Sequence, residues 1–167
     1  AEHLVQINEL NKQATACKND GDWSGAIAAL REAKQLSGKW YRDTKLALYL
    51  QQAGQFSASM REFDWLLKNS LTVSKRLFGH NPTSVVMAQH ASWCARVHAK
   101  AALAAKREKN TDMEQHHTQK AEQYAALNSK LKTISDAEQR AKRKEYEQAR
   151  TAGNEAMTAF LRKYKRL

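Results

Sequence analysis

Residues that interrupt helices are scarce in this chain, and their scarcity limits the folds that it can adopt. Its 167 residues include one proline, Pro82, and six glycines. A β-sandwich or barrel needs a turn about every 8–12 residues, and such turns usually contain glycine or proline. Residues 83–152 contain neither. The chain is therefore predicted to be all-α, and with 42% hydrophobic residues it can bury the core of a single domain.

The spacing of apolar residues predicts six or seven helices, because these residues recur every three or four positions. Turn clusters at residues 19–22, 37–38, 53–54 and 78–82 end the first four helices. The third of these helices is expected over about residues 40–52. A fifth helix is expected over residues 83–108, and a capping-box pattern at residues 111–114 begins a sixth. The same pattern at residues 135–138 indicates a seventh helix. A single long helix over residues 112–164 is the alternative, since nothing near Ser135 enforces a break.

The first four predicted helices contain an internal repeat. When the chain is shifted by 33 residues, small residues align with small ones, aromatic with aromatic, and large apolar with large apolar. The aligned pairs include Gly21 with Gly54, Trp23 with Phe56, Ala26 with Ser59 and Leu30 with Phe63. This offset is close to the roughly 34 residues of a helix-turn-helix repeat unit.

These residues resemble the tetratricopeptide-repeat (TPR) family. Its pattern has a small residue midway along the first helix, here Ala14 and Ala47, followed by a Gly-polar-aromatic turn and a small residue early in the second helix. Residues 77–82 resemble the inter-repeat linker of the kinesin-light-chain-like subtype. The resemblance implies antiparallel hairpins stacked as a right-handed superhelix. It places repeats at residues 4–38 and 40–78, a degenerate repeat at 82–134 and a capping helix at 136–165. A generic helical bundle is the alternative.

The chain is strongly basic, with a formal net charge of +11 and a sequence pI of about 9.8. The excess is spread evenly, since residues 1–106 carry +6 and residues 107–167 carry +5. Such charge favours encounter with acidic partners of any kind, including RNA, DNA and acidic proteins. The densest basic run, at residues 140–144, is flanked by glutamates and lacks interleaved aromatic residues, so we expect a solvated helix face there.

Motifs for catalysis, cofactors and metals are absent from the sequence. It contains no HExxH, GxSxG or glycine-rich phosphate loop, and the adjacent His116 and His117 would point about 100° apart on a helix. We therefore expect no enzyme, cofactor or metal site. Cys17 and Cys94 are expected to be buried thiols, with a disulfide as the alternative in an oxidising compartment. No run is long enough to span a membrane. We expect a cytoplasmic protein, with export after signal-peptide removal as the alternative.

The TPR resemblance implies a scaffold or adaptor that binds a protein or peptide in a concave surface lined by the first helix of each unit. In this hypothesis cations attract an acidic segment, while Tyr41 and Trp93 supply apolar anchors. The predicted partner-binding residues are Asn11, Thr15, Lys18, Tyr41, Lys45, Leu48, Trp93, Arg96 and Lys100. One alternative is a basic helical nucleic-acid-binding protein, whose affinity would fall steeply with salt. Another is a homo-oligomer that pairs through the helix at residues 112–164.

Overall fold

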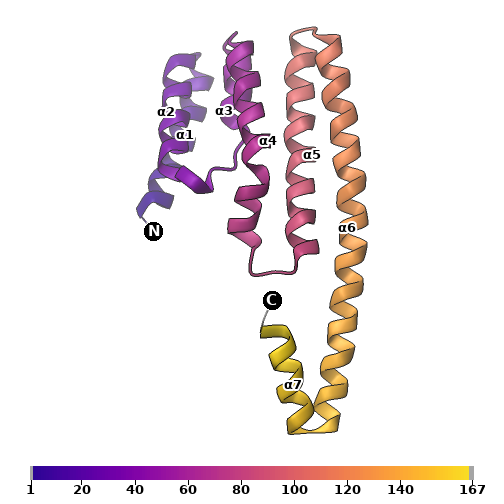
Figure 1. The fold of residues 1–167 in the computed structure, drawn as a ribbon. Helices are drawn as coiled ribbons and strands as arrows, with labels where there is room; N and C mark the ends of the chain where they lie inside the picture. Colours follow the sequence, from indigo (N-terminus) through magenta and orange to yellow (C-terminus); the bar gives the residue numbers. More distant parts are fainter. Residues whose placement is uncertain (1, 166–167) are drawn as a thin grey trace.

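The computed structural model describes residues 2–165, and within this range the chain forms helices and no strands, which confirms the all-α prediction (Figure 1). A short 3-10 turn, η1, separates the second and third of the α-helices. The elements are α1 (Glu2–Asn19), α2 (Trp23–Ser37), η1 (Gly38–Trp40), α3 (Lys45–Gln52), α4 (Phe56–Phe78), α5 (Thr83–Arg107), α6 (Thr111–Ala152) and α7 (Asn154–Lys165). None of the helices in this range is both long and apolar enough to cross a membrane.

Helix α3 is shorter than the sequence pattern predicts, because it begins at Lys45 rather than near Trp40. The backbone N–H of Lys45 donates to Asp43 Oδ1 (2.8 Å), so a carboxylate just before the helix binds one of its free backbone donors. The preceding residues form the η1 turn and an extended connection. Tyr41 therefore leaves the helical register that the prediction gave it, and its side chain turns into the core, where 6% remains exposed.

Helix α6 continues through Ser135, so the predicted helix start at this position is wrong. Ser135 is buried beside α5, and Ser84 Oγ donates a hydrogen bond to Glu138 Oε2. The alternative of one long helix holds as far as Ala152. The break comes at Gly153, whose φ of 106° lies in the region that favours glycine. Helix α7 then folds back along the end of α6, beyond the reach of α5 (Figure 1).

Three helical hairpins, α1/α2, α3/α4 and α5/α6, follow one another along the molecule (Figure 1). The first helices form one row, since Lys45 Nζ on α3 donates to Asn11 O on α1 (2.9 Å) and Gln51 Nε2 at the end of α3 donates to Glu108 Oε1 just after α5 (2.8 Å). In the second row, Lys34 on α2 forms an ion pair with Glu62 on α4 (2.6 Å). Helices α4 and α6 line a common cavity.

All three hairpins turn in the same way. In each turn a backbone N–H reaches five residues back: Asp22 to Cys17, Gln55 to Leu50 (both 2.8 Å) and Asn110 to Ala105 (2.9 Å). The residue before each of these donors has a positive φ, namely 77° at Gly21, 79° at Gly54 and 56° at Lys109. The third turn thus has the geometry of the first two, although its sequence contains no glycine.

The core consists of two clusters of buried side chains. The first fills the space between α1, α2 and α3, and the second joins α3, α4 and α5. At the repeat-equivalent small residues, which let the helices of a hairpin approach closely, none of the surface is exposed, and Ser59 Oγ donates to Ala47 O (2.6 Å). These residues are Ala14 and Ala26 in the first hairpin and Ala47 and Ser59 in the second.

Candidate functional site

Four of the predicted partner-binding residues lie together where α1 meets α3. Lys45 Nζ donates to Asn11 O (2.9 Å) and to Thr15 Oγ1 (2.8 Å), so it ties the two helices together. The ammonium of Lys18 lies 5.2 Å and that of Lys45 5.6 Å from the centre of the Tyr49 ring. These are cation–π contacts, which hold the cations over a buried aromatic ring.

A second group of cations lies where α3 meets α5. The guanidinium of Arg42 lies 4.8 Å and that of Arg96 5.8 Å from the Trp93 ring centre. Arg42 Nη2 also donates to Gln89 O (3.1 Å). Lys100 follows one helical turn after Arg96. Sequence reasoning missed Arg42, because the predicted third helix did not place the connection before α3 against α5.

Two predicted anchors are core residues, which corrects the sequence-based hypothesis. Only 6% of Tyr41 and 5% of Trp93 are exposed, and both belong to the second core cluster, where Tyr41 packs on Trp65 at 5.8 Å between ring centres. Leu48 is half-buried against the same cluster. Trp40, one residue before Tyr41, is instead exposed, at 48%. We call the other predicted residues, together with Arg42, the first-helix surface: Asn11, Thr15, Lys18, Arg42, Lys45, Arg96 and Lys100.

The cations of the first-helix surface have few acidic neighbours. Helices α3 and α5 contain no Asp or Glu, while α5 carries Arg96, Lys100, Lys106 and Arg107. Burial lowers the pKa of Arg42, and the charge of Arg96 lowers it further. The pKa of His90 is lowered in turn by burial and by Arg42. The crowded positive charges thus raise one another's free energy, and an anionic partner would relieve this cost.

A hollow of about 220 Å³ lies where α1, α2 and the connection before α3 meet. Asn11 and Arg42 both line it, and the exposed Trp40 stands at its edge. Its remaining lining is mostly apolar and consists of Ile7, Leu30, Ala33, Ser37, Tyr41, Asp43 and Leu46. We call it the α1/α3 hollow. Its size suits one side chain of a partner rather than a cofactor, since ligand pockets are usually roughly 300–1,000 Å³.

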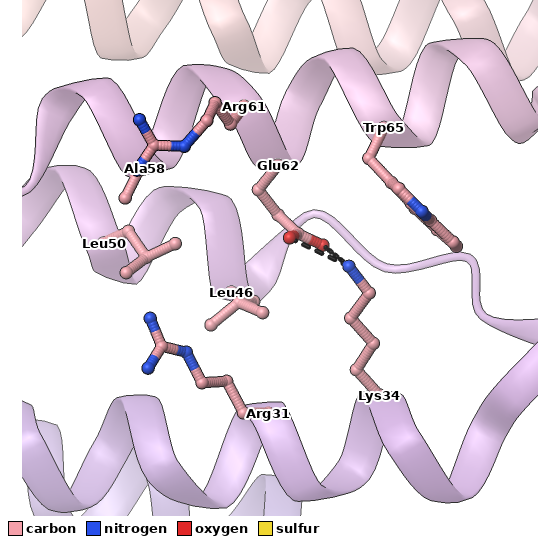
Figure 2. Close-up of a pocket in the computed structure, with 8 residues that line it drawn as sticks. All are labelled: Arg31, Lys34, Leu46, Leu50, Ala58, Arg61, Glu62 and Trp65. Atoms are coloured by element: carbon pink, nitrogen blue, oxygen red, sulfur yellow. Dashed lines mark hydrogen bonds and ion pairs between the residues drawn. The ribbon is translucent and has the colours of Figure 1, made fainter.

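A larger hollow of about 330 Å³ opens between the second helices, and sequence reasoning missed it (Figure 2). Its lining joins residues about one repeat apart, which only the packing of α2 beside α4 brings together. Lys34 Nζ donates to both carboxylate oxygens of Glu62 (2.6 and 2.9 Å). We call it the α2/α4 hollow; it is lined by Arg31, Lys34, Leu46, Leu50, Ala58, Arg61, Glu62 and Trp65.

A pair of histidines between α5 and α6 is a further feature that sequence reasoning missed. His98 Nδ1 and His117 Nδ1 lie 2.8 Å apart, so one imidazole donates to the other. His98 stacks on Tyr124 (5.6 Å between ring centres) and is 6% exposed. Burial, aided by His117, His116 and Lys120, lowers the pKa of His98 to about 4. In the sequence His117 stands next to His116 and far from His98, and no spacing rule links residues on two different helices.

Groups that would support metal or disulfide chemistry are not assembled in the described part of the chain. Among residues 2–165, no three His, Cys, Asp or Glu side chains come together in a way that could hold a metal ion. Cys17 and Cys94 are both free thiols, half-buried and buried respectively. Cys94 Sγ donates to Ser70 Oγ at 3.3 Å.

Comparisons of the chain with family models, curated proteins and solved structures found no match. Its function is therefore inferred from its own charges, contacts and hollows.

Proposed function

We propose that this chain is a helical-repeat protein of the tetratricopeptide type that binds an acidic segment of another protein on its first-helix surface. One observation carries the proposal: cations from α1, the connection before α3, α3 and α5 crowd onto this surface, while α3 and α5 contribute no carboxylate. Electrostatic complementarity of this kind raises the association rate and orients the partner.

The repeated turns support the assignment of a repeat architecture. Gly21, Gly54 and Lys109 occupy equivalent places with a positive φ, and the following residue makes the same backbone hydrogen bond in each turn. The small residues of the first two hairpins are equally buried. Hairpins built alike can stack side by side, and their first helices then line a continuous surface.

The surface offers a partner both free charge and a place for one side chain. Lys18, Arg96 and Lys100 make no ion pair with any described carboxylate, so they are free to meet the acidic groups of a partner. The α1/α3 hollow accepts a neighbouring apolar side chain against Leu46, beside Trp40. Lys45 has a structural role instead, since it bonds to α1.

The same cations would attract nucleic acid, but the aromatic rings beside them favour a protein partner. The Tyr49 and Trp93 rings are buried and face Lys45 and Arg42. They are therefore not open platforms on which bases could stack, as proteins that bind single-stranded nucleic acids require.

A capture experiment tests the proposal. The tagged chain is used to capture partners from extracts of its source cells, with and without nuclease, beside the variant Arg96→Glu/Lys100→Glu. The matched control, Lys75→Glu/Lys132→Glu, changes charge equally at exposed residues of α4 and α6. We expect a protein that survives nuclease and the control changes but is lost from the α5 variant. Loss of all partners on nuclease treatment would identify nucleic acid instead and would overturn the proposal.

A further inference from the structure

The α2/α4 hollow has an apolar floor and walls of two different kinds. Leu46 and Leu50 of α3, together with Ala58 of α4, form the floor. At about 330 Å³ the hollow is at the small end of ligand pockets, which are roughly 300–1,000 Å³. It therefore has room for one or two side chains of a partner.

One end of the hollow is closed by a pair of charges that neutralise each other. Lys34 and Glu62 are bonded at 2.6 Å, and their side chains are only 25% and 13% exposed. The ammonium of Lys34 also lies 4.1 Å from the Trp65 ring centre, so it covers the aromatic face. These contacts make this end a fixed wall, and neither charge is free to meet a ligand.

The other end presents two arginines without carboxylate partners. Figure 2 shows Arg31 extending from α2 and Arg61 lying along α4, with their guanidinium groups on either side of Leu50. Both residues are exposed, and among the described residues neither guanidinium makes an ion pair. Planar guanidinium groups bind carboxylates through two parallel hydrogen bonds, so this end is built for an acidic group.

We propose that the α2/α4 hollow is a second docking site, which binds a protein segment with an aliphatic side chain next to one or two carboxylates. The aliphatic side chain packs on Leu46, Leu50 and Ala58, and the carboxylates bind Arg31 and Arg61. The apolar floor favours such a segment over nucleic acid, because a phosphate backbone has nothing to bury there. The arginines of this site lie on the second helices, outside the first-helix surface, although Leu46 lines both this hollow and the α1/α3 hollow.

The test uses three short fluorescein-labelled peptides and the full chain, with binding read by fluorescence anisotropy. The first peptide alternates glutamate and leucine, the second replaces leucine with serine, and the third replaces glutamate with lysine. The chain is compared with Arg31→Ala/Arg61→Ala and with a charge-matched control, Lys75→Ala/Lys132→Ala. The variant Arg96→Glu/Lys100→Glu shows whether the peptide binds the first-helix surface instead.

We expect the first peptide to bind, and Arg31→Ala/Arg61→Ala to weaken binding roughly tenfold or more, since two charge-assisted arginine–carboxylate contacts are lost. The control should stay within about twofold, as exposed charges outside a contact contribute little. The α5 variant should lose only the binding that the first-helix surface contributes and should keep the part that depends on Arg31 and Arg61. The serine peptide should bind roughly tenfold more weakly, because the apolar contact is lost. The lysine peptide should not bind.

Three outcomes would overturn this inference. The first is equal binding by the chain and by Arg31→Ala/Arg61→Ala. The second is loss of binding only in Arg96→Glu/Lys100→Glu. This result would show that the peptide binds the first-helix surface and not the hollow, and it would agree with the proposed function. The third is self-association of the chain that light scattering detects and that Arg31→Ala/Arg61→Ala abolishes. In that case a second copy of the chain would occupy the hollow.

Discussion

Lys109 adopts a backbone conformation that residues with side chains rarely take. Its φ is 56°, in the left-handed region, where a Cβ atom crowds the following carbonyl oxygen at a cost of roughly 1–2 kcal/mol. Glycine fills the equivalent places at residues 21 and 54. The third turn is therefore held by its hydrogen bonds and by the Asn110 side chain, which accepts from Met113 N (3.1 Å), against an unfavourable local preference.

Replacing Lys109 with glycine should stabilise the fold. Glycine adopts the left-handed conformation without strain, which stabilises the folded state. Glycine also gives the unfolded chain more conformational freedom, which offsets part of this stabilisation. We therefore expect urea unfolding to show about 0.5–1 kcal/mol of added stability. Gly21→Ala, at the equivalent place in the first turn, should destabilise by about 1 kcal/mol. A Lys109→Gly variant less stable than the parent would mean that the three turns are not equivalent.

The His98–His117 pair should make stability depend on acidity. The folded pKa of His98, about 4, lies below its usual value of 6.5, so the unfolded state takes up a proton first as the pH falls. The stabilisation that neutral His98 gives the folded state is complete above about pH 6.5. As the pH falls from about 6.5 to about 4, the free energy of unfolding decreases by up to about 3 kcal/mol. His116 and Lys120 on α6 add to the shift, and Arg61 and Asp64 of α4 line the same cavity.

This pH dependence can be checked by urea unfolding between pH 4 and pH 6.5. The parent chain is compared with His98→Gln and with His3→Gln. His98→Gln should flatten the loss of stability between about pH 6.5 and pH 4, whatever its effect at neutral pH. His3 lies on the exposed first turn of α1, so its substitution should not change how steeply the free energy of unfolding falls with pH. If the free energy of unfolding falls equally steeply with pH in all three proteins, the neutral His98–His117 pair does not stabilise the fold.

Among the helices, α7 depends on few contacts. Among residues 2–165 it packs only on the end of α6, where Phe160 lies 5.6 Å from Tyr146 and 4.7 Å from Tyr164 between ring centres, and Lys163 binds Glu145 at 2.6 Å. The ion pair is exposed and should contribute little. The aromatic contacts are therefore the main attachment of this helix.

Phe160→Ala should release α7 without unfolding the rest of the molecule. We expect hydrogen exchange in residues 154–165 to accelerate roughly tenfold or more, since local openings need little free energy where few apolar contacts hold an element. Exchange in α5 and the thermal midpoint should stay unchanged. A cooperative loss of protection in α5 would show instead that α7 belongs to the main folding unit.

Helix boundaries followed from the sequence where a residue type enforced them. The turns at Gly21 and Gly54 and the linker before α5 all lie where glycine, asparagine and proline predicted them. The third turn also lies where the end of the fifth helix and the capping pattern at residues 111–114 predicted it, but its left-handed geometry was not predicted because lysine replaces glycine at residue 109. Ser135 was misread as a helix start, because a capping pattern caps only when the backbone donors are free, and here they lie inside α6.

In the molecule as a whole, two rows of helices present two surfaces of different chemistry. The candidate site was only partly predictable: Asn11, Thr15, Lys18 and Lys45, which the resemblance to tetratricopeptide repeats placed on one surface, lie together in the structure. Tyr41 and Trp93 are not part of it, because their large aromatic side chains are buried in the second core cluster. The α2/α4 hollow depends on how two hairpins pack, which spacing along one helix does not reveal.

Photo-crosslinking from the first-helix surface tests the central claim most directly. Ala99, an exposed residue of α5 close to Arg96, is replaced with p-benzoylphenylalanine, and Ala126, an exposed residue of α6, receives the same group as the control. After irradiation in source-cell extract, mass spectrometry identifies what is attached at each position. The account predicts that position 99, but not position 126, captures one protein through a segment rich in Asp and Glu. Nucleic acid at position 99, or the same products at both positions, would contradict it.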